Sequence, residues 1–224
     1  MKSLFYILFF LFTVRTYAQT DEINNSILTA EKAIENKEYK KAIAIYKELS
    51  DNYKFNPDFL FNLANLYFIT DNIENACECL YNAAILNDKE AVELIESKCQ
   101  TYKNGKVKLL QQVDSPPKFL YQSVYHNLIE NNVINPIYID AIKYYTKGKK
   151  YLPDYLMKYI EIDVKIDERG NFIGKIDSFD YDNTEINLIK NDLEKILKTN
   201  IKYKPAIYKG ESVEIFENYS LTLL

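Results

Sequence analysis

The sequence predicts an α+β protein with an N-terminal part of α-helical hairpins and a small C-terminal α/β part. Three observations predict this fold class. Helical patterns in the first half repeat with a period of 34 residues. Tyr159–Ile166 alternates between apolar and charged side chains, as a half-buried strand does. An apolar helical stripe then precedes another alternating segment at the end of the chain. We therefore expect a three-stranded antiparallel sheet packed by helices in the second part.

The first residues predict a secretory signal peptide over 1–18. Lys2 precedes the apolar run Leu4–Val14, and Ala18 supplies the small residue at a cleavage site. The run has 11 residues and ends at Arg15, whereas a membrane-spanning helix needs roughly 20. We expect cleavage after Ala18, with an uncleaved anchor as the alternative. The mature chain is then periplasmic, with no integral membrane span and with outer-membrane association left open.

Composition excludes a nucleic-acid partner. The net charge is −4, and removal of Lys2 and Arg15 leaves 26 basic residues against 32 acidic ones, a charge of −6. Such a chain lacks the basic footprint that neutralises phosphates. Its cysteines are Cys77, Cys79 and Cys99, which allow at most one disulfide, between Cys99 and either Cys77 or Cys79. We interpret them as mainly structural.

Two passes of a helical hairpin superimpose within the predicted domain 22–100. Each pass places small or apolar residues at matching points, all 34 residues apart: Ala30 and Ala64, Ala33 and Tyr67, Ala42 and Ala76, Tyr46 and Leu80, Leu49 and Ala83. A further helix over Lys89–Cys99 is expected to cap them. This pattern resembles the tetratricopeptide repeat. The resemblance implies a scaffold with a concave face for a peptide or protein, and coincidental spacing of ordinary hairpins is the alternative.

A polar linker is predicted at 101–112, followed by the domain 113–224. After an extended lead-in at Val113–Phe119, Leu120–Asn131 is expected to form a helix that stops before Asn135-Pro136. A short helix over Ile137–Tyr145 is expected to follow.

The remaining elements are a hairpin, a helix and a last strand. Asp167–Asn171 is expected to turn the first strand into its partner, Phe172–Ser178. Asp182 and Glu185 form a capping-box pair ahead of the next helix. Its apolar stripe is Ile186, Ile189, Leu193, Ile196 and Leu197. The third strand is expected to contain Val213, Ile215, Tyr219, Leu221 and Leu223, with Glu217 as the one polar residue of that row.

Four stretches of the second half, VDSPPKF, NLIENNVINP, DERGNF and YKPAIYKGESVE, resemble the TonB C-terminal domain. Tyr203 stands where that family usually has tryptophan, and TKGKKYLPDYLMK at 146–158 looks like an insertion. The resemblance implies a last strand that accepts a transporter's TonB box as an added strand. The implied peptide contacts are Ile134, Asn135, Glu211, Val213, Ile215, Phe216, Tyr219 and Leu221. The alternative is a blunted edge, because Glu211, Glu214 and Glu217 are charges of the kind that discourage edge pairing.

No arrangement of residues predicts catalysis. His126 is the only histidine, and the chain has neither a paired CxxC nor a GxSxG elbow. We expect a non-enzymatic periplasmic scaffold without cofactor or metal, which binds a protein or peptide partner. The alternative is an accessory component of TonB-dependent outer-membrane transport. An energy transducer itself is not expected, because the membrane helix and the proline-rich spacer of such a protein are not found in this sequence. The partner, the oligomeric state and any cover of the last strand by Tyr144–Lys158 stay open.

Overall fold

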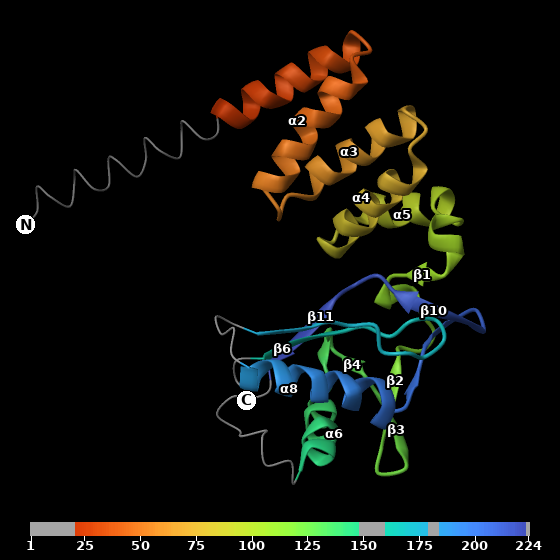
Figure 1. Ribbon diagram of the computed structural model, residues 1–224. Coiled ribbons are helices and arrows are strands. Elements are labelled where there is room, and N and C mark those ends of the chain that lie inside the picture. Colours follow the sequence, from red (N-terminus) through yellow and green to blue (C-terminus); the bar gives the residue numbers. More distant parts are fainter. Residues whose placement is uncertain (1–20, 148–159, 179–183, 223–224) are drawn as a thin grey trace, which may run out of the picture. The chain divides into compact units, whose positions relative to one another are not determined.

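The structure is a computed structural model that describes residues 21–147, 160–178 and 184–222 (Figure 1). The fold is α+β, as predicted: packed helices come first, and small sheets with helices follow. The chain divides into two compact units, Met1–Tyr102 and Lys103–Leu224. We call them the helical unit and the mixed unit. In the described residues no helix is long and apolar enough to cross a membrane.

The helical unit is a series of packed antiparallel hairpins. Its helices span residues 21–35, α2 (Tyr39–Asn52), α3 (Pro57–Ile69), α4 (Ile73–Ile85) and α5 (Lys89–Lys98). Three of them begin at a polar cap: the side chains of Asn56, Asn72 and Asp88 accept backbone N–H groups of α3, α4 and α5. Pro57 occupies the first turn of α3, where its missing N–H leaves no bond unmade.

The 34-residue period is visible in the structure as well as in the sequence. Nine of the ten matched side chains are buried, and Tyr67 is half-buried. The turn inside each hairpin also repeats, because Lys37 has φ 59° and Asp71 has φ 58°. In both turns the next residue donates its N–H back to the helix, from Glu38 to the Ala33 carbonyl at 2.7 Å and from Asn72 to the Tyr67 carbonyl at 2.8 Å. The two passes therefore share packing and turn geometry.

A disulfide joins Cys77 in α4 to Cys99, the residue that caps α5. Of the two pairings left open by the sequence, the structure has this one. Cys79 remains a free, buried thiol. Burial raises its pKa to about 12, and the nearby Glu78 carboxylate acts in the same direction. The thiol is therefore protonated and unreactive at neutral pH.

The described part of the mixed unit contains short strands and two longer helices. Its elements are 3-10 turns at Tyr102–Gly105 and Leu110–Gln112, β1 (Val107–Lys108), β2 (Lys118–Tyr121), β3 (Val124–Asn127), β4 (Ile129–Glu130), β5 (Val133–Ile134), α6 (Pro136–Thr146), β6 (Ile160–Val164), β7 (Ile176–Ser178), α8 (Thr184–Lys195), a π-helical turn at Ile196–Asn200, β8 (Tyr203–Lys204), β9 (Ala206–Tyr208), β10 (Glu211–Ile215) and β11 (Tyr219–Thr222). The sheets have the orders β11-β6-β7, β3-β2-β8, β1-β10-β9 and β4-β5. β1 lies within the stretch predicted as a linker.

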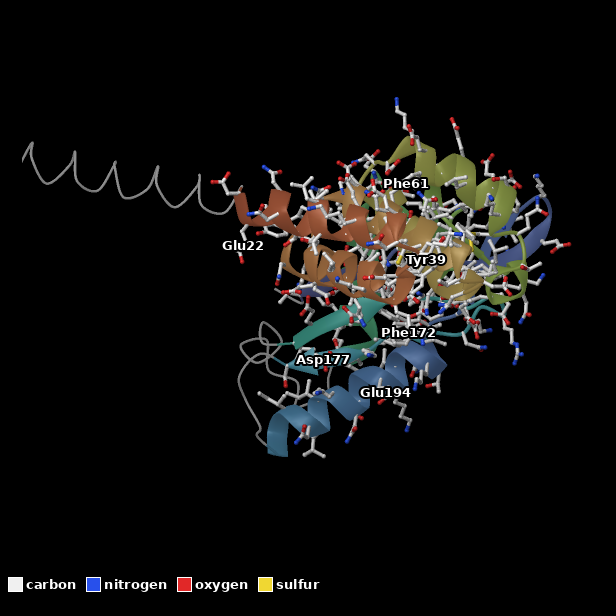
Figure 2. The ribbon with its side chains drawn as sticks, turned by 90° about the horizontal axis from the view of Figure 1, so that it is seen from above. Glu22, Tyr39, Phe61, Phe172, Asp177 and Glu194 are labelled. Carbon is white, nitrogen blue, oxygen red and sulfur yellow. A yellow bond between two sulfur atoms is a disulfide. The ribbon has the colours of Figure 1, made fainter. Side chains whose placement is uncertain are left out.

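The sheet β11-β6-β7 is the predicted three-stranded antiparallel sheet. Ile160, Ile162, Val164 and Ile166 on one side of β6 are buried, as the alternation predicted. α8 runs alongside this sheet (Figure 1). The five residues of the predicted stripe are all buried, and four of them, Ile189, Leu193, Ile196 and Leu197, belong to the same core as β6. Phe172 joins that core from the β6–β7 hairpin (Figure 2). The sheet and helices therefore share a single core.

The predicted hairpin turn at Asp167–Asn171 is confirmed. Gly170 has φ +82°, the left-handed conformation that the turn requires. The Asp167 carboxylate accepts the backbone N–H groups of Arg169 at 2.9 Å and Asn171 at 2.7 Å. It also accepts the Asn171 side-chain amide at 2.9 Å. These bonds fix the register in which Ile162 pairs with Ile176.

The prediction of a helix over Leu120–Asn131 is wrong. Residues 118–127 form the β2–β3 hairpin, and residues 129–134 form the second hairpin, β4–β5. Helical spacing of Val124, Leu128 and Ile129 was misleading, because only Leu128 and Ile129 are buried, and they lie at the bend between β3 and β4 and at the start of β4. Pro136 opens α6 at its first turn, so the helix predicted over Ile137–Tyr145 is present.

The prediction of a single last strand is also wrong. β10 and β11 are separate strands in different sheets, with residues 216–218 between them. The alternation continues through both, so Val213, Ile215 and Leu221 are buried in one core. Asp182, the Glu185 side chain and Leu223 lie outside the described residues, as does most of the predicted insertion at 146–158.

Candidate binding surfaces

β10, which holds three of the implied peptide contacts, is an interior strand. β9 pairs with it at Glu211 and Val213, and β1 pairs with it in parallel at Ile215. Phe216 extends this second ladder, because its N–H donates to the Lys108 carbonyl at 2.8 Å. Glu211 is exposed and forms an ion pair with Lys106 at 3.0 Å. Both edges of β10 are therefore occupied, and an added strand has no place there.

A half-buried group of charges lies around the end of β10. Lys165, directly after β6, forms an ion pair with Glu214 in β10 at 3.0 Å. Both oxygens of the Glu217 carboxylate accept the N–H of Leu110, at 2.9 and 3.0 Å. Burial raises the pKa of Glu217, and this effect outweighs the Leu110 bond and the positive charge of Lys165, which lower it. Glu217 therefore anchors the turn at Leu110–Gln112 and does not project to block an edge.

Replacing Glu217 by glutamine is expected to stabilise the fold more at neutral pH than at acid pH. The pKa of Glu217 is higher in the folded chain than in the unfolded chain, so the folded state favours the protonated carboxyl. The wild-type contribution is complete below the unfolded pKa and is lost as the pH rises through the raised folded pKa. Urea unfolding of both chains across this pH range measures the difference. If the difference in the free energy of unfolding between the variant and the wild type grew toward acid pH, the expectation would be contradicted.

β11 is an edge strand, and its geometry shows which backbone groups face outward. The Asp163 N–H donates to the Lys175 carbonyl in the β6–β7 hairpin at 2.8 Å, so it faces away from β11. Asp163 is opposite Ser220. Because the groups of a strand alternate in direction, the N–H groups of Ser220 and Thr222 point away from β6. Among the residues that the structure describes, neither takes part in a backbone hydrogen bond on that outer side.

Side chains on β11 support the same arrangement. The Ser220 hydroxyl donates to the Asp163 carboxylate at 2.6 Å, across a position where antiparallel side chains approach closely. Tyr219 is half-buried, and burial raises its pKa to about 12. Leu221 is buried in the core. The two predicted contacts on β11 thus fix the strand to its sheet, while the N–H groups of Ser220 and Thr222 point to its outer side.

β5, which contains Ile134, lies close to β11. Ile134 packs against the core. Asn135 is buried, caps α6 by accepting the Ile137 N–H at 3.0 Å, and donates its amide to the Asn127 carbonyl at 3.0 Å. Asn135 is therefore a structural residue. Ile134, Tyr219 and Leu221 thus pack in or against the same core as Val213 and Ile215, although β10 and β11 belong to different sheets.

The aromatic residues of the mixed unit are packing groups. His126 is on β3, where its ring lies 5.6 Å from that of Phe119, and not on the predicted helix. The hydroxyls of Tyr138 and Tyr203 are 2.8 Å apart, and burial raises the pKa of both. They stay neutral and hydrogen-bonded. In the described ranges no three His, Cys, Asp or Glu residues converge on a metal position.

The helical unit has two hollows beside its first helix. One has a volume of about 480 Å³ and is lined by Ile23, residues 51–56 and Phe59. Phe55 on its rim is 90% exposed, although it is a large apolar side chain. The other hollow has a volume of about 590 Å³ and an acidic lining that includes Asp21, Glu22 and Glu48. Glu22 lies at the start of the first described helix (Figure 2).

Sequence reasoning missed Phe55, Ser220 and Thr222. Phe55 stands between two helical patterns, next to Asn56-Pro57, and an apolar residue in such a turn was a signal of exposure. Nothing in the sequence singles out Ser220 or Thr222, because their importance depends on the register with β6.

In comparisons with protein-family models, curated proteins and solved structures, no match to this chain was found.

Proposed function

We propose that the chain is a non-enzymatic periplasmic scaffold whose helical unit binds protein partners as tetratricopeptide repeats do. The repeat carries the proposal: matched buried residues and matched left-handed turns recur 34 residues apart. Stacked hairpins of this kind present extended surfaces and have no need of reactive groups. The exposed Phe55 beside an apolar hollow adds a site of the kind that anchors partners.

The periplasm is the proposed compartment. The Cys77–Cys99 disulfide fits an oxidising environment, because cytosolic thiols are kept reduced. The expected signal peptide supports the same location. Together they favour partners that are themselves exported or that face the periplasm.

A second candidate is that the mixed unit, as a TonB C-terminal-like domain, engages a transporter segment during outer-membrane uptake. The outward N–H groups of Ser220 and Thr222 favour it. An extended peptide added at this edge would satisfy them, and its alternate side chains would lie near Ile134. A separate protein would then supply the energy for transport.

The two candidates are tested by cross-linking and capture from periplasm with the chain beginning at Gln19. Phe55→Asp places a charge at the apolar rim and is expected to remove partners of the helical unit. Ser220→Pro deletes one outward N–H without touching the β6 ladder, since proline is tolerated on an edge. Ser220→Ala loses the same hydroxyl and keeps the N–H, so it is the matched control.

If partners are lost with Phe55→Asp and not with Ser220→Pro, the result supports the scaffold function of the helical unit. Loss of a TonB-dependent transporter with Ser220→Pro, and its retention with Ser220→Ala, supports the uptake role. Circular dichroism establishes that each variant is folded. If folded variants of both kinds capture all that the unaltered chain captures, both candidates fail.

A further inference from the structure

One face of the sheet β3-β2-β8 gathers three lysines. Phe119 in β2 points into the core, so its neighbours Lys118 and Leu120 point to the opposite face. Lys118 is paired directly with Lys204. The Leu120 N–H donates to the Lys202 carbonyl at 2.8 Å, which places Lys202 beside Leu120. We call Lys118, Lys202 and Lys204 the lysine face.

This arrangement is electrostatically unfavourable in the isolated protein. Like charges directly opposite each other on paired strands destabilise a sheet. No carboxylate in the part of the chain that the structure describes forms an ion pair with any of these three lysines. Lys204 has its ammonium 4.1 Å from the centre of the Tyr125 ring, which does not neutralise its charge. An acidic chain thus concentrates unpaired positive charge at one place.

Exposed apolar and aromatic side chains flank the turn of the same hairpin. Tyr125 is opposite Leu120 and lies on the lysine face, whereas Val124 is opposite Tyr121 and lies on the other face. Val124 is 55% exposed, Tyr125 37% and Tyr144 59%. Tyr144 packs edge-on against Tyr121, 6.0 Å away, so α6 and the hairpin share this rim. The turn between β2 and β3 lies at the periphery of the mixed unit, beside α6 (Figure 1). Tyrosine prefers an environment with one apolar and one wet side.

We propose that the β2–β3 hairpin docks on the surface of a bilayer that contains anionic phospholipids. The lysine face attracts the phosphate groups, and ammonium groups can do so without a fixed ligand geometry. The hairpin meets the membrane with its turn, so that Val124 on one face and Tyr125 on the other enter the boundary between headgroups and acyl chains. An acidic peptide would neutralise the positive charge of the lysine face but would leave the exposed apolar side chains without a partner. The proposal is independent of both proposed functions, since neither uses these residues.

The test is co-sedimentation of the chain beginning at Gln19 with vesicles at low ionic strength. One set contains phosphatidylglycerol and phosphatidylcholine in equal parts, and the other contains phosphatidylcholine alone. We expect binding to the anionic vesicles only, and weaker binding as salt is added. Each lysine close to an anionic surface raises the affinity for it roughly fivefold. Replacing Lys118, Lys202 and Lys204 by glutamine is therefore expected to lower the affinity for the anionic vesicles roughly 100-fold.

A matched control removes the same charge elsewhere. Lys32, Lys40 and Lys89 are exposed in the helical unit, and their replacement by glutamine is expected to leave most of the binding intact. Val124→Ser is expected to weaken vesicle binding with no change in charge. Equal binding to both kinds of vesicle, equal loss in the two triple variants, or capture by polyglutamate without vesicle binding would overturn the proposal.

Discussion

Gly174→Ala is expected to open the β6–β7 hairpin, with a loss of about 3 kcal/mol or more in the free energy of unfolding of the mixed unit. A Cβ at Gly174 would lie 1.8 Å from the Asp163 carbonyl oxygen, a backbone atom with no freedom to turn aside. It would also lie 2.8 Å from the Phe172 ring. The strands must separate where Asp163 bonds Lys175, and the core on the other face of β6 loosens with them.

Gly210→Ala is the control for the loss of a glycine as such. Gly210 has φ +80°, and an added Cβ there meets no atom within 4 Å. Only the left-handed backbone strain remains, which costs about 1 kcal/mol. Urea unfolding followed by circular dichroism compares the two, and hydrogen exchange of β6 and β7 localises the effect. Equal losses in both variants would show that close approach at Gly174 is not the cause.

Periodicity was sufficient to predict the elements that bury one continuous face. β6, the stripe of α8 and the paired helices of the first half each place apolar residues at the spacing of their own secondary structure. In the 34-residue repeat, small or apolar residues recur at matching positions and nearly all are buried, so each pass supports the prediction for the other. These elements were found because their local pattern and their packing agree.

The β2–β3 and β4–β5 hairpins were missed because their turns carry no glycine. Gln122 and Ser123 have φ 47° and 68°, and Asn131 and Asn132 have φ 53° and 62°. Two successive left-handed residues make the tight turn that matches the twist of paired strands. Asparagine tolerates this conformation, so Asn131-Asn132 was a readable turn signal. Gln122-Ser123 was not, and the strands impose its conformation.

The segment predicted to accept a peptide does not form a single edge strand. Resemblance placed a peptide along the whole segment from Glu211 to Leu221, whereas β1 and β9 already occupy both sides of β10. Alternation does not reveal that a strand changes sheets at residues 216–218, because its buried side chains continue in the same rhythm. Only the pairing of β11 with β6 shows that Ser220 and Thr222 are the outward residues.

Removing the Cys77–Cys99 disulfide is expected to lower the free energy of unfolding of the helical unit by about 3 kcal/mol. The bond joins residues with a sequence separation of 22, and a covalent loop of this length restricts the unfolded chain by about that amount. Without it, α5 is held to α4 by packing, while the Asp88 cap, which accepts the Ala91 N–H at 3.1 Å, stabilises only the start of α5 itself. The paired substitutions Cys77→Ala and Cys99→Ala make this change.

Cys79→Ala is the matched control, since it removes a sulfur from the same helix without breaking a bond between helices. It is expected to cost about 1 kcal/mol through a small cavity. Dithiothreitol should lower the stability of the unaltered chain to that of the double variant and leave the double variant unchanged. Hydrogen exchange should then rise first in α5, because that helix depends most on the bond. If α5 keeps its protection after reduction, packing alone fixes the end of the repeat, and the disulfide then has no part in holding it.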